Sequence, residues 1–206
     1  ILTIESGTNH LIFTNQDTGE VYVFNKLNDT LKKRGRLNEI TTREWRDSGK
    51  TGIRYFYDSE GRIAFALLPT GQDYYIDYEY WTSTSRYLTK VTVWTGNPLH
   101  NPSAVELAEV EYTYAVEDLI DINPWLGSPG DLLQVKVRRR DSALTGWIER
   151  VTQYRYYFSD DAAHQKGFLK AIFEHDAIHR LIENLGCGLT PDSLLSYGDC
   201  VPITFQ

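Results

Sequence analysis

The sequence has no methionine and two cysteines among its 206 residues, and none of its apolar runs reaches the length of a transmembrane helix or a signal peptide. A chain without methionine does not begin at a translational start, so we expect a segment of a longer protein. Any toxin domain, protease or membrane anchor is then expected outside the segment. The residues at both ends, Ile1–Ile4 and Val201–Phe205, indicate edge strands that pair with missing residues or with adjacent copies.

Basic residues are outnumbered, with 21 Lys and Arg against 28 Asp and Glu, a net charge of −7 and a pI near 5.2. This balance argues against nucleic acid as a partner, because a phosphate backbone requires a basic surface. Arg138–Arg140 is a run of basic residues, but Asp141 follows it, and we interpret the run as the solvated end of a strand.

Recognisable catalytic motifs are also missing: there is no Gly-x-Ser-x-Gly, phosphate-binding glycine-rich loop or Cys/His dyad. His175 and His179 are spaced as in the His-Glu-x-x-His zinc proteases, with Glu183 one helical turn further on. Asp176 stands where the glutamate base should be, and its shorter side chain would not reach the same water. We therefore interpret this segment as the polar face of a helix and predict no enzyme, metal or cofactor. A metallohydrolase is the distant alternative.

The two cysteines, Cys187 and Cys200, lie close together in a glycine-containing segment. A disulfide between them is plausible in an exported protein. It would stabilise the fold by about 3 kcal/mol, because it reduces the conformational entropy of the unfolded chain. Two free thiols are the alternative. The pair alone does not predict a zinc site, because structural zinc requires four ligands.

Tyrosine is abundant, and it recurs in pairs separated by one residue. Residues at alternate positions of a strand point to the same side, so each pair predicts a strand with two aromatic rings on one face. Recurrence of one pattern along a chain is typical of a repeated supersecondary unit, which builds an extended sheet rather than a pocket. The pairs are Tyr55 and Tyr57, Tyr78 and Tyr80, Tyr112 and Tyr114, and Tyr154 and Tyr156.

The best-formed unit runs from Tyr55 to Ile63. Its Asp58-Ser59-Glu60-Gly61 segment is typical of a turn, because Asp can accept hydrogen bonds from the turn's backbone and Gly adopts a positive φ. Arg62 and Ile63 should begin the return strand, and a second turn and strand follow. Weaker copies of the unit lie at Gly35–Thr41, Arg86–Val91, Asp131–Val135 and Gly167–Ile172, with a leading hairpin strand at Gly19–Phe24.

The pattern Tyr55-x-Tyr57-Asp58-x-x-Gly61-Arg62-Ile63, followed by Leu68-Pro69-x-Gly71 and a further Tyr-x-Tyr, resembles the YD-repeat (Rhs-type) family. The resemblance covers roughly residues 10–185, although one copy alone is sharp. It implies a mainly β fold: an array of antiparallel hairpins in a curved or spiralling sheet. It further implies a structural segment of a large secreted or cell-surface protein that encloses cargo or forms a surface assembly. Its partners would be flanking repeats or adjacent copies.

One segment changes period. Apolar residues every three or four positions from Phe173 to Leu185 predict an amphipathic helix that Gly186 ends. We therefore divide the chain into a leading hairpin region (1–34), degenerate repeat hairpins (35–172), a helical insertion (173–186), and a loop with the start of a further strand (187–206). The helix is expected to cover one face or end of the sheet.

Exposed aromatic residues suggest a second function. Tyrosine and tryptophan side chains on a sheet can stack on sugar rings, and the family that the chain resembles has been linked to carbohydrate binding. The alternative is cross-strand aromatic packing, which stabilises a sheet by about 0.2–1 kcal/mol per pair. The regular Tyr-x-Tyr spacing favours packing over a glycan site. The tryptophans concerned are Trp45, Trp81, Trp94, Trp125 and Trp147.

Overall fold

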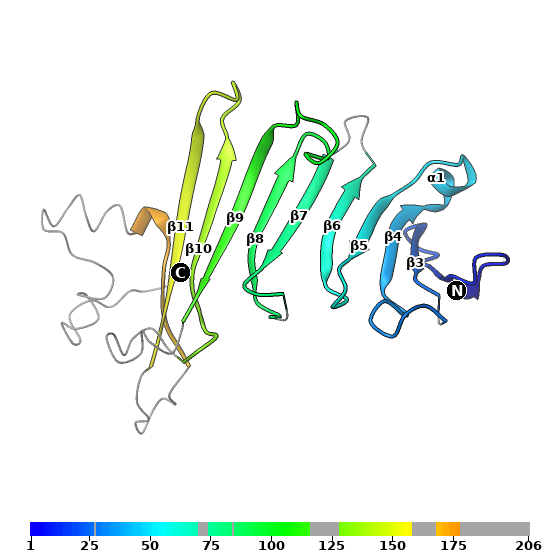
Figure 1. Cartoon of the computed structure of the whole chain (residues 1–206), viewed down its shortest axis with the longest axis horizontal. Helices are drawn as coiled ribbons and strands as arrows, with labels where there is room; N and C mark the ends of the chain where they lie inside the picture. Colours follow the sequence, from blue (N-terminus) through cyan, green and yellow to red (C-terminus); the bar gives the residue numbers. More distant parts are fainter. Residues whose placement is uncertain (27, 70–73, 84, 116–127, 158–167, 178–206) are drawn as a thin grey trace, which may run out of the picture. The chain divides into compact units, whose positions relative to one another are not determined.

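A computed structural model describes residues 1–26, 28–69, 74–83, 85–115, 128–157 and 168–177 (Figure 1). The fold is mainly β: twelve antiparallel strands form one open sheet, and their order in the sheet is their order in the sequence. The predicted hairpin array is therefore confirmed. No helix among these residues has the length and apolar character needed to cross a membrane.

Most strands are rich in β-branched and aromatic residues, which favour a pleated, half-buried surface. A short helix, α1, interrupts them. The elements are β1 (Leu2–Ile4), β2 (Leu11–Thr14), β3 (Glu20–Phe24), β4 (Leu37–Thr42), α1 (Arg43–Asp47), β5 (Ile53–Tyr57), β6 (Ile63–Leu68), β7 (Tyr74–Tyr80), β8 (Leu88–Trp94), β9 (Glu106–Tyr114), β10 (Leu132–Arg140), β11 (Trp147–Tyr156) and β12 (Leu169–Phe173).

The chain divides into two compact units whose boundaries cut across β9, β10 and β11. Unit 1 contains residues 1–109 and 139–147, and unit 2 contains residues 110–138 and 148–206. Unit 1 holds β1 to β8, drawn from blue to green in Figure 1, with successive hairpins side by side. Strand β1 is the first strand of the sheet and pairs with β2 through Leu2, Thr3 and Ile4.

The hairpins share a backbone irregularity. In four hairpins the strand register shifts at the last residue of the first strand: β3–β4, β5–β6, β7–β8 and β11–β12. In each of them this last residue is the second of two aromatic residues that are separated by one position. One residue of the return strand is thereby left without an opposite partner, as in a β-bulge, which increases local twist. The sequence repeat is therefore also a repeat of backbone geometry. The pairs at the shift are Phe24 with Leu37, Tyr57 with Ile63, Tyr80 with Leu88, and Tyr156 with Leu169.

Strand register assigns the residues of unit 1 to two faces, because directly opposite residues point to the same side. We call the face that carries Tyr55 and Tyr78 the tyrosine face, and the other the inner face. The inner face holds most of the buried side chains of unit 1, including Val21, Val23 and Tyr75. Its centre is a stack in which Phe65 lies 4.4 Å from Phe56 and 5.1 Å from Tyr75 between ring centroids.

Two predicted boundaries are wrong by one or two residues. Strand β6 begins at Ile63, not at Arg62, because the Arg62 N–H donates to the Asp58 carboxylate instead of joining the ladder. Phe173 belongs to β12, where it pairs with Gln153 and is 2 % exposed. The second helix begins at His175 and is described as far as residue 177. Its predicted remainder, with His179, Glu183 and the two cysteines, lies outside the described residues.

Candidate functional site

The eight paired tyrosines all lie on strands: Tyr55 and Tyr57 on β5, Tyr78 and Tyr80 on β7, Tyr112 and Tyr114 on β9, and Tyr154 and Tyr156 on β11. Two regions of unit 1 carry the chemistry that bears on function. One is the turn between β5 and β6. The other is a cleft at the opposite end of the same strands, where the β4–β5 and β8–β9 connections meet the end of β6 and the start of β7.

Asp58 organises the turn between β5 and β6. Its Oδ1 accepts from the backbone N–H of Glu60 at 2.8 Å and of Arg62 at 2.9 Å, and its Oδ2 lies 2.7 Å from Arg62 Nε and 2.6 Å from Nη2. Partial burial acts to raise the pKa of Asp58, but the hydrogen bonds and charge of Arg62, with the Glu60 N–H, outweigh it and hold that pKa below its ordinary value. The carboxylate is thus kept ionised.

Gly61 is the residue that this turn requires. Its φ is +75°, in the left-handed region that L side chains rarely adopt, and a Cβ at this position would lie 2.4 Å from the backbone oxygen of Lys32. Glycine therefore serves both backbone conformation and close approach. The Lys32 side chain also reaches the turn, with Nζ 2.7 Å from Glu60 Oε2.

Arg62 connects this turn to the next one. Its Nη1 donates to the backbone oxygens of Thr82 (3.0 Å) and Ser85, both in the β7–β8 connection. Its guanidinium lies over the Tyr80 ring, 4.2 Å from the centroid, and the Tyr80 hydroxyl donates to the Ile63 oxygen at 3.0 Å. With 17 % of its side chain exposed, Arg62 is held between two hairpins by partners on both.

The contact from Tyr80 to Ile63 recurs in other hairpins, and we call it the tyrosine–carbonyl bridge. In each case the second tyrosine of a pair donates to the first residue of an earlier return strand. Tyr57 donates to the Leu37 oxygen in unit 1, and Tyr156 donates to the Leu132 oxygen at 2.8 Å in unit 2. Burial raises the pKa of Tyr57, Tyr80 and Tyr156, so these hydroxyls remain protonated donors at neutral pH. The glycines at the corresponding turns, Gly35, Gly61 and Gly130, all have positive φ.

Charged side chains in the sheet are also occupied by pairing across strands. Lys90 on β8 lies 3.5 Å from Glu79 and 3.0 Å from Glu109, whose side chain is 2 % exposed. The Glu109 hydrogen bond, opposed by partial burial and assisted by Glu79, raises the pKa of Lys90. In unit 2, Lys136 lies 2.8 Å from Glu111 and 3.9 Å from Glu149. Each lysine therefore pairs with two carboxylates and helps to hold neighbouring strands together.

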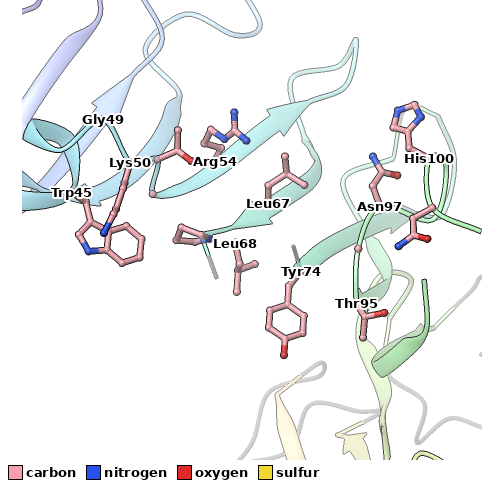
Figure 2. Close-up of a pocket in the computed structure, with 15 residues that line it drawn as sticks. Trp45, Gly49, Lys50, Arg54, Leu67, Leu68, Tyr74, Thr95, Asn97 and His100 are labelled. Atoms are coloured by element: carbon pink, nitrogen blue, oxygen red, sulfur yellow. The ribbon is translucent and has the colours of Figure 1, made fainter. Parts of the chain in front are cut away.

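The cleft at the opposite end of unit 1 has a volume of about 990 Å³ (Figure 2). Trp45 on α1 and Lys50 line it from the β4–β5 connection, Arg54 and Tyr74 from strands, and Asn97 and His100 from the β8–β9 connection. Figure 2 shows Leu67 and Leu68 on opposite sides of β6, so the cleft reaches both faces of the sheet end.

Helix α1 positions Trp45. Thr42 caps the helix, its hydroxyl accepting from the Trp45 N–H at 3.2 Å, and Gly49 follows with a φ of +74°. Arg46 on the same helix pairs with Glu5 in the β1–β2 connection. This helix was not predicted from the sequence, although a Thr cap followed by Glu44 and a closing Gly is a helix signal.

The tryptophans do not form one surface. Trp45 lines the cleft, whereas Trp81 is 45 % exposed and packs at 6.0 Å against Tyr87. Trp94 has a buried indole N–H without a hydrogen-bond partner among the described residues, and Trp147 lies under Arg140 at 4.2 Å. Trp125 lies outside the described residues. Among those residues, no group of three or more His, Cys, Asp or Glu is arranged to hold a metal ion.

No protein-family model and no curated protein sequence matches the chain. The relation to YD-repeat proteins therefore stays a prediction. The polar residues of the cleft were also not predicted from the sequence, because most of them lie in connections outside the repeated pattern. Asn97-Pro98 and Asn101-Pro102 are turn signals that mark one of these connections.

Proposed function

We propose that this chain is a structural segment of a large secreted or surface-exposed YD-repeat protein, in which it contributes to a β-sheet scaffold or shell. The observation that carries the proposal is the recurrent hairpin end: a positive-φ glycine, a register shift at the second aromatic, and a tyrosine–carbonyl bridge. In such an array each unit contacts its neighbours, so stability is approximately a sum of unit and interface terms.

The shell would enclose cargo or form a surface assembly. Flanking repeats of the same polypeptide, or adjacent copies of it, are the proposed partners, and they would pair with open edges such as β1. The extracellular or cell-surface location follows from the family resemblance. No catalytic activity or cofactor is proposed, since the polar groups described at the hairpin ends are used to join one hairpin to the next.

The size and location of the natural protein test the proposal. An antibody raised against this chain should detect a polypeptide far larger than 23.7 kDa in the cells that produce it. Protease added to intact cells should remove the signal, while a cytoplasmic marker protein is spared. A single protease-protected band near 23.7 kDa would contradict the scaffold function.

Glycan binding is the second candidate, and the cleft favours it. Trp45 and Tyr74 line the same cavity as two amide side chains, Asn97 and Asn101, and aromatic rings combined with amides are suited to sugars. Screening the purified chain on a glycan array should give binding that Trp45→Ala abolishes. Trp81→Ala is the matched control, because Trp81 is exposed elsewhere, in the β7–β8 connection. Binding that is unaffected by Trp45→Ala would remove the cleft from this role.

A further inference from the structure

The charge of the cleft differs from that of the whole chain. Lys50, Arg54 and His100 line it, and none of its lining residues among those described is Asp or Glu. The chain as a whole carries a net charge of −7. A basic cleft in an acidic protein attracts anions, because Coulomb attraction is stronger where apolar walls lower the local dielectric.

Arg54 is the central feature of this cleft. Its Nε is buried without a hydrogen-bond partner, and its guanidinium has no ion pair among the described residues. Glu39 is directly opposite Arg54 on β4, but its Oε1 accepts from the Gly52 N–H instead. A buried donor without a partner is costly, whereas hydrogen bonds to charged groups are among the strongest in proteins. Arg54 as a residue is half-buried and lines the cleft, so an incoming anion would meet its charge there with no ion pair to displace among the described residues.

The two asparagines of the cleft also present donors. Asn97 Oδ1 accepts from the Leu99 N–H at 2.9 Å, and Asn101 Oδ1 accepts from the Ser103 N–H at 3.0 Å. Because both amide oxygens are engaged in their own turns, the NH₂ groups are the parts left to meet a ligand. The two amides thus add donors beside Arg54, and such a group of donors suits a ligand that carries acceptors.

An apolar surface lies beside these donors. Leu67 is directly opposite Arg54 and on the same, inner face. A flat ring could pack on Leu67 while a group attached to it reaches the guanidinium. A carboxylate matches the planar fork of Arg54, which can donate two parallel hydrogen bonds.

We propose that the cleft of unit 1 binds a small organic anion, with its carboxylate on Arg54 and its ring on Leu67. The ring could come from a sugar acid or from an aromatic acid, and both offer the same chemistry to Arg54. A sugar acid as the ligand rests on the glycan-binding function proposed above, whereas the requirement for a carboxylate does not.

Titration of the whole chain with matched ligands tests this proposal. Glucuronate and phenylacetate carry the carboxylate, glucose and 2-phenylethanol are their neutral counterparts, and inorganic phosphate is a non-carboxylate anion. Binding is followed by NMR chemical-shift changes or calorimetry. At least one carboxylate should bind about tenfold more tightly than its neutral counterpart, the size expected for one charge-assisted hydrogen bond. Arg54→Gln should remove this preference, and His100→Gln should reduce it.

Arg34→Gln is the control. It removes the same positive charge, but from an exposed residue of the β3–β4 connection, at the other end of the strands. It should leave affinities unchanged, and thermal unfolding should show that each variant is folded. Equal affinity for the charged and neutral members of both pairs, or phosphate binding as tight as carboxylate binding, overturns the proposal. If glucose binds as well as glucuronate, glycan binding stands and the carboxylate inference fails. Binding of phenylacetate alone supports the inference and removes the glycan function, whereas no binding at all contradicts both.

Discussion

Two arginines at opposite ends of the same hairpins have opposite environments. Arg62, at the β5–β6 turn, has partners on Asp58, Thr82 and Ser85 and lies over an aromatic ring. Arg54, at the cleft, has a buried Nε with no partner among the described residues. The turn end uses its arginine to join hairpins, whereas the cleft end leaves the Nε of its arginine without a partner among the described residues. The difference separates a region whose arginine stabilises the fold from the region in which we propose binding.

Glycine substitutions should show the largest contrast between the two ends. Gly61→Ala should lower the free energy of unfolding by about 3 kcal/mol, through a left-handed backbone and a clash with the Lys32 oxygen. Gly49→Ala has nearly the same φ, +74°, but no atom within 4 Å of the added Cβ, so it should cost about 1 kcal/mol. Urea denaturation measures both. Equal losses would show that the close approach at Gly61 is unimportant.

Removing the two arginine side chains compares the ends directly. Arg62→Ala should cost about 2–3 kcal/mol, because it leaves a partly buried carboxylate and two carbonyls without their donor. Arg54→Ala should change stability by less than about 1 kcal/mol, because it also removes an unsatisfied buried donor. Denaturant midpoints of the two variants, compared with Arg34→Ala, give the ranking. A larger loss at Arg54 would reverse the comparison.

Removing one hydroxyl should have a smaller effect. Tyr80→Phe deletes the bridge to the Ile63 oxygen and should cost about 1 kcal/mol. Tyr55→Phe, on strand β5 of the preceding hairpin, is the matched control: its hydroxyl has no hydrogen bond to any of the described residues, so the change should be near neutral. Chemical unfolding of both variants separates the bridge from general aromatic packing, and similar values for the two would count against the bridge.

The pH dependence should be the smallest effect and should differ in sign between two carboxyls. The folded pKa of Asp58 is lowered, so its contribution is present above the unfolded value near pH 3.9 and is lost as pH falls through the folded pKa. Burial raises the pKa of Asp77, and the negative charge of Glu79 adds to this effect. Ionisation of Asp77 therefore destabilises the folded state. This loss of stability develops as pH rises through the pKa of the unfolded chain and then through that of the folded protein. Asp58→Asn should therefore lower stability at pH 7 and Asp77→Asn should raise it, each by under about 1 kcal/mol. Unfolding midpoints at pH 3 and pH 7 test both signs.

The extent to which sequence predicted structure also differs between the two ends. Alternating tyrosines and the Asp-x-x-Gly turn predicted β5, β6 and β7, because the two-residue period and turn chemistry are local properties. The partners of Arg62 in the next hairpin could not be predicted, since they depend on register between strands. The cleft was missed because Arg54 and Asn97 come together only after three connections fold. Helix α1 was not predicted because its five residues are too few to show a helical period of apolar positions.

The central claim is that Arg62 and Tyr80 act together to join neighbouring hairpins, and a double-mutant cycle measures this directly. Stabilities of the original chain, Arg62→Ala, Tyr80→Leu and the double variant would be determined by urea denaturation. We predict a coupling free energy of about 1 kcal/mol, the size expected for a cation over a partly buried ring. Losses that add to within about 0.3 kcal/mol would show that the two residues act independently and would contradict the account.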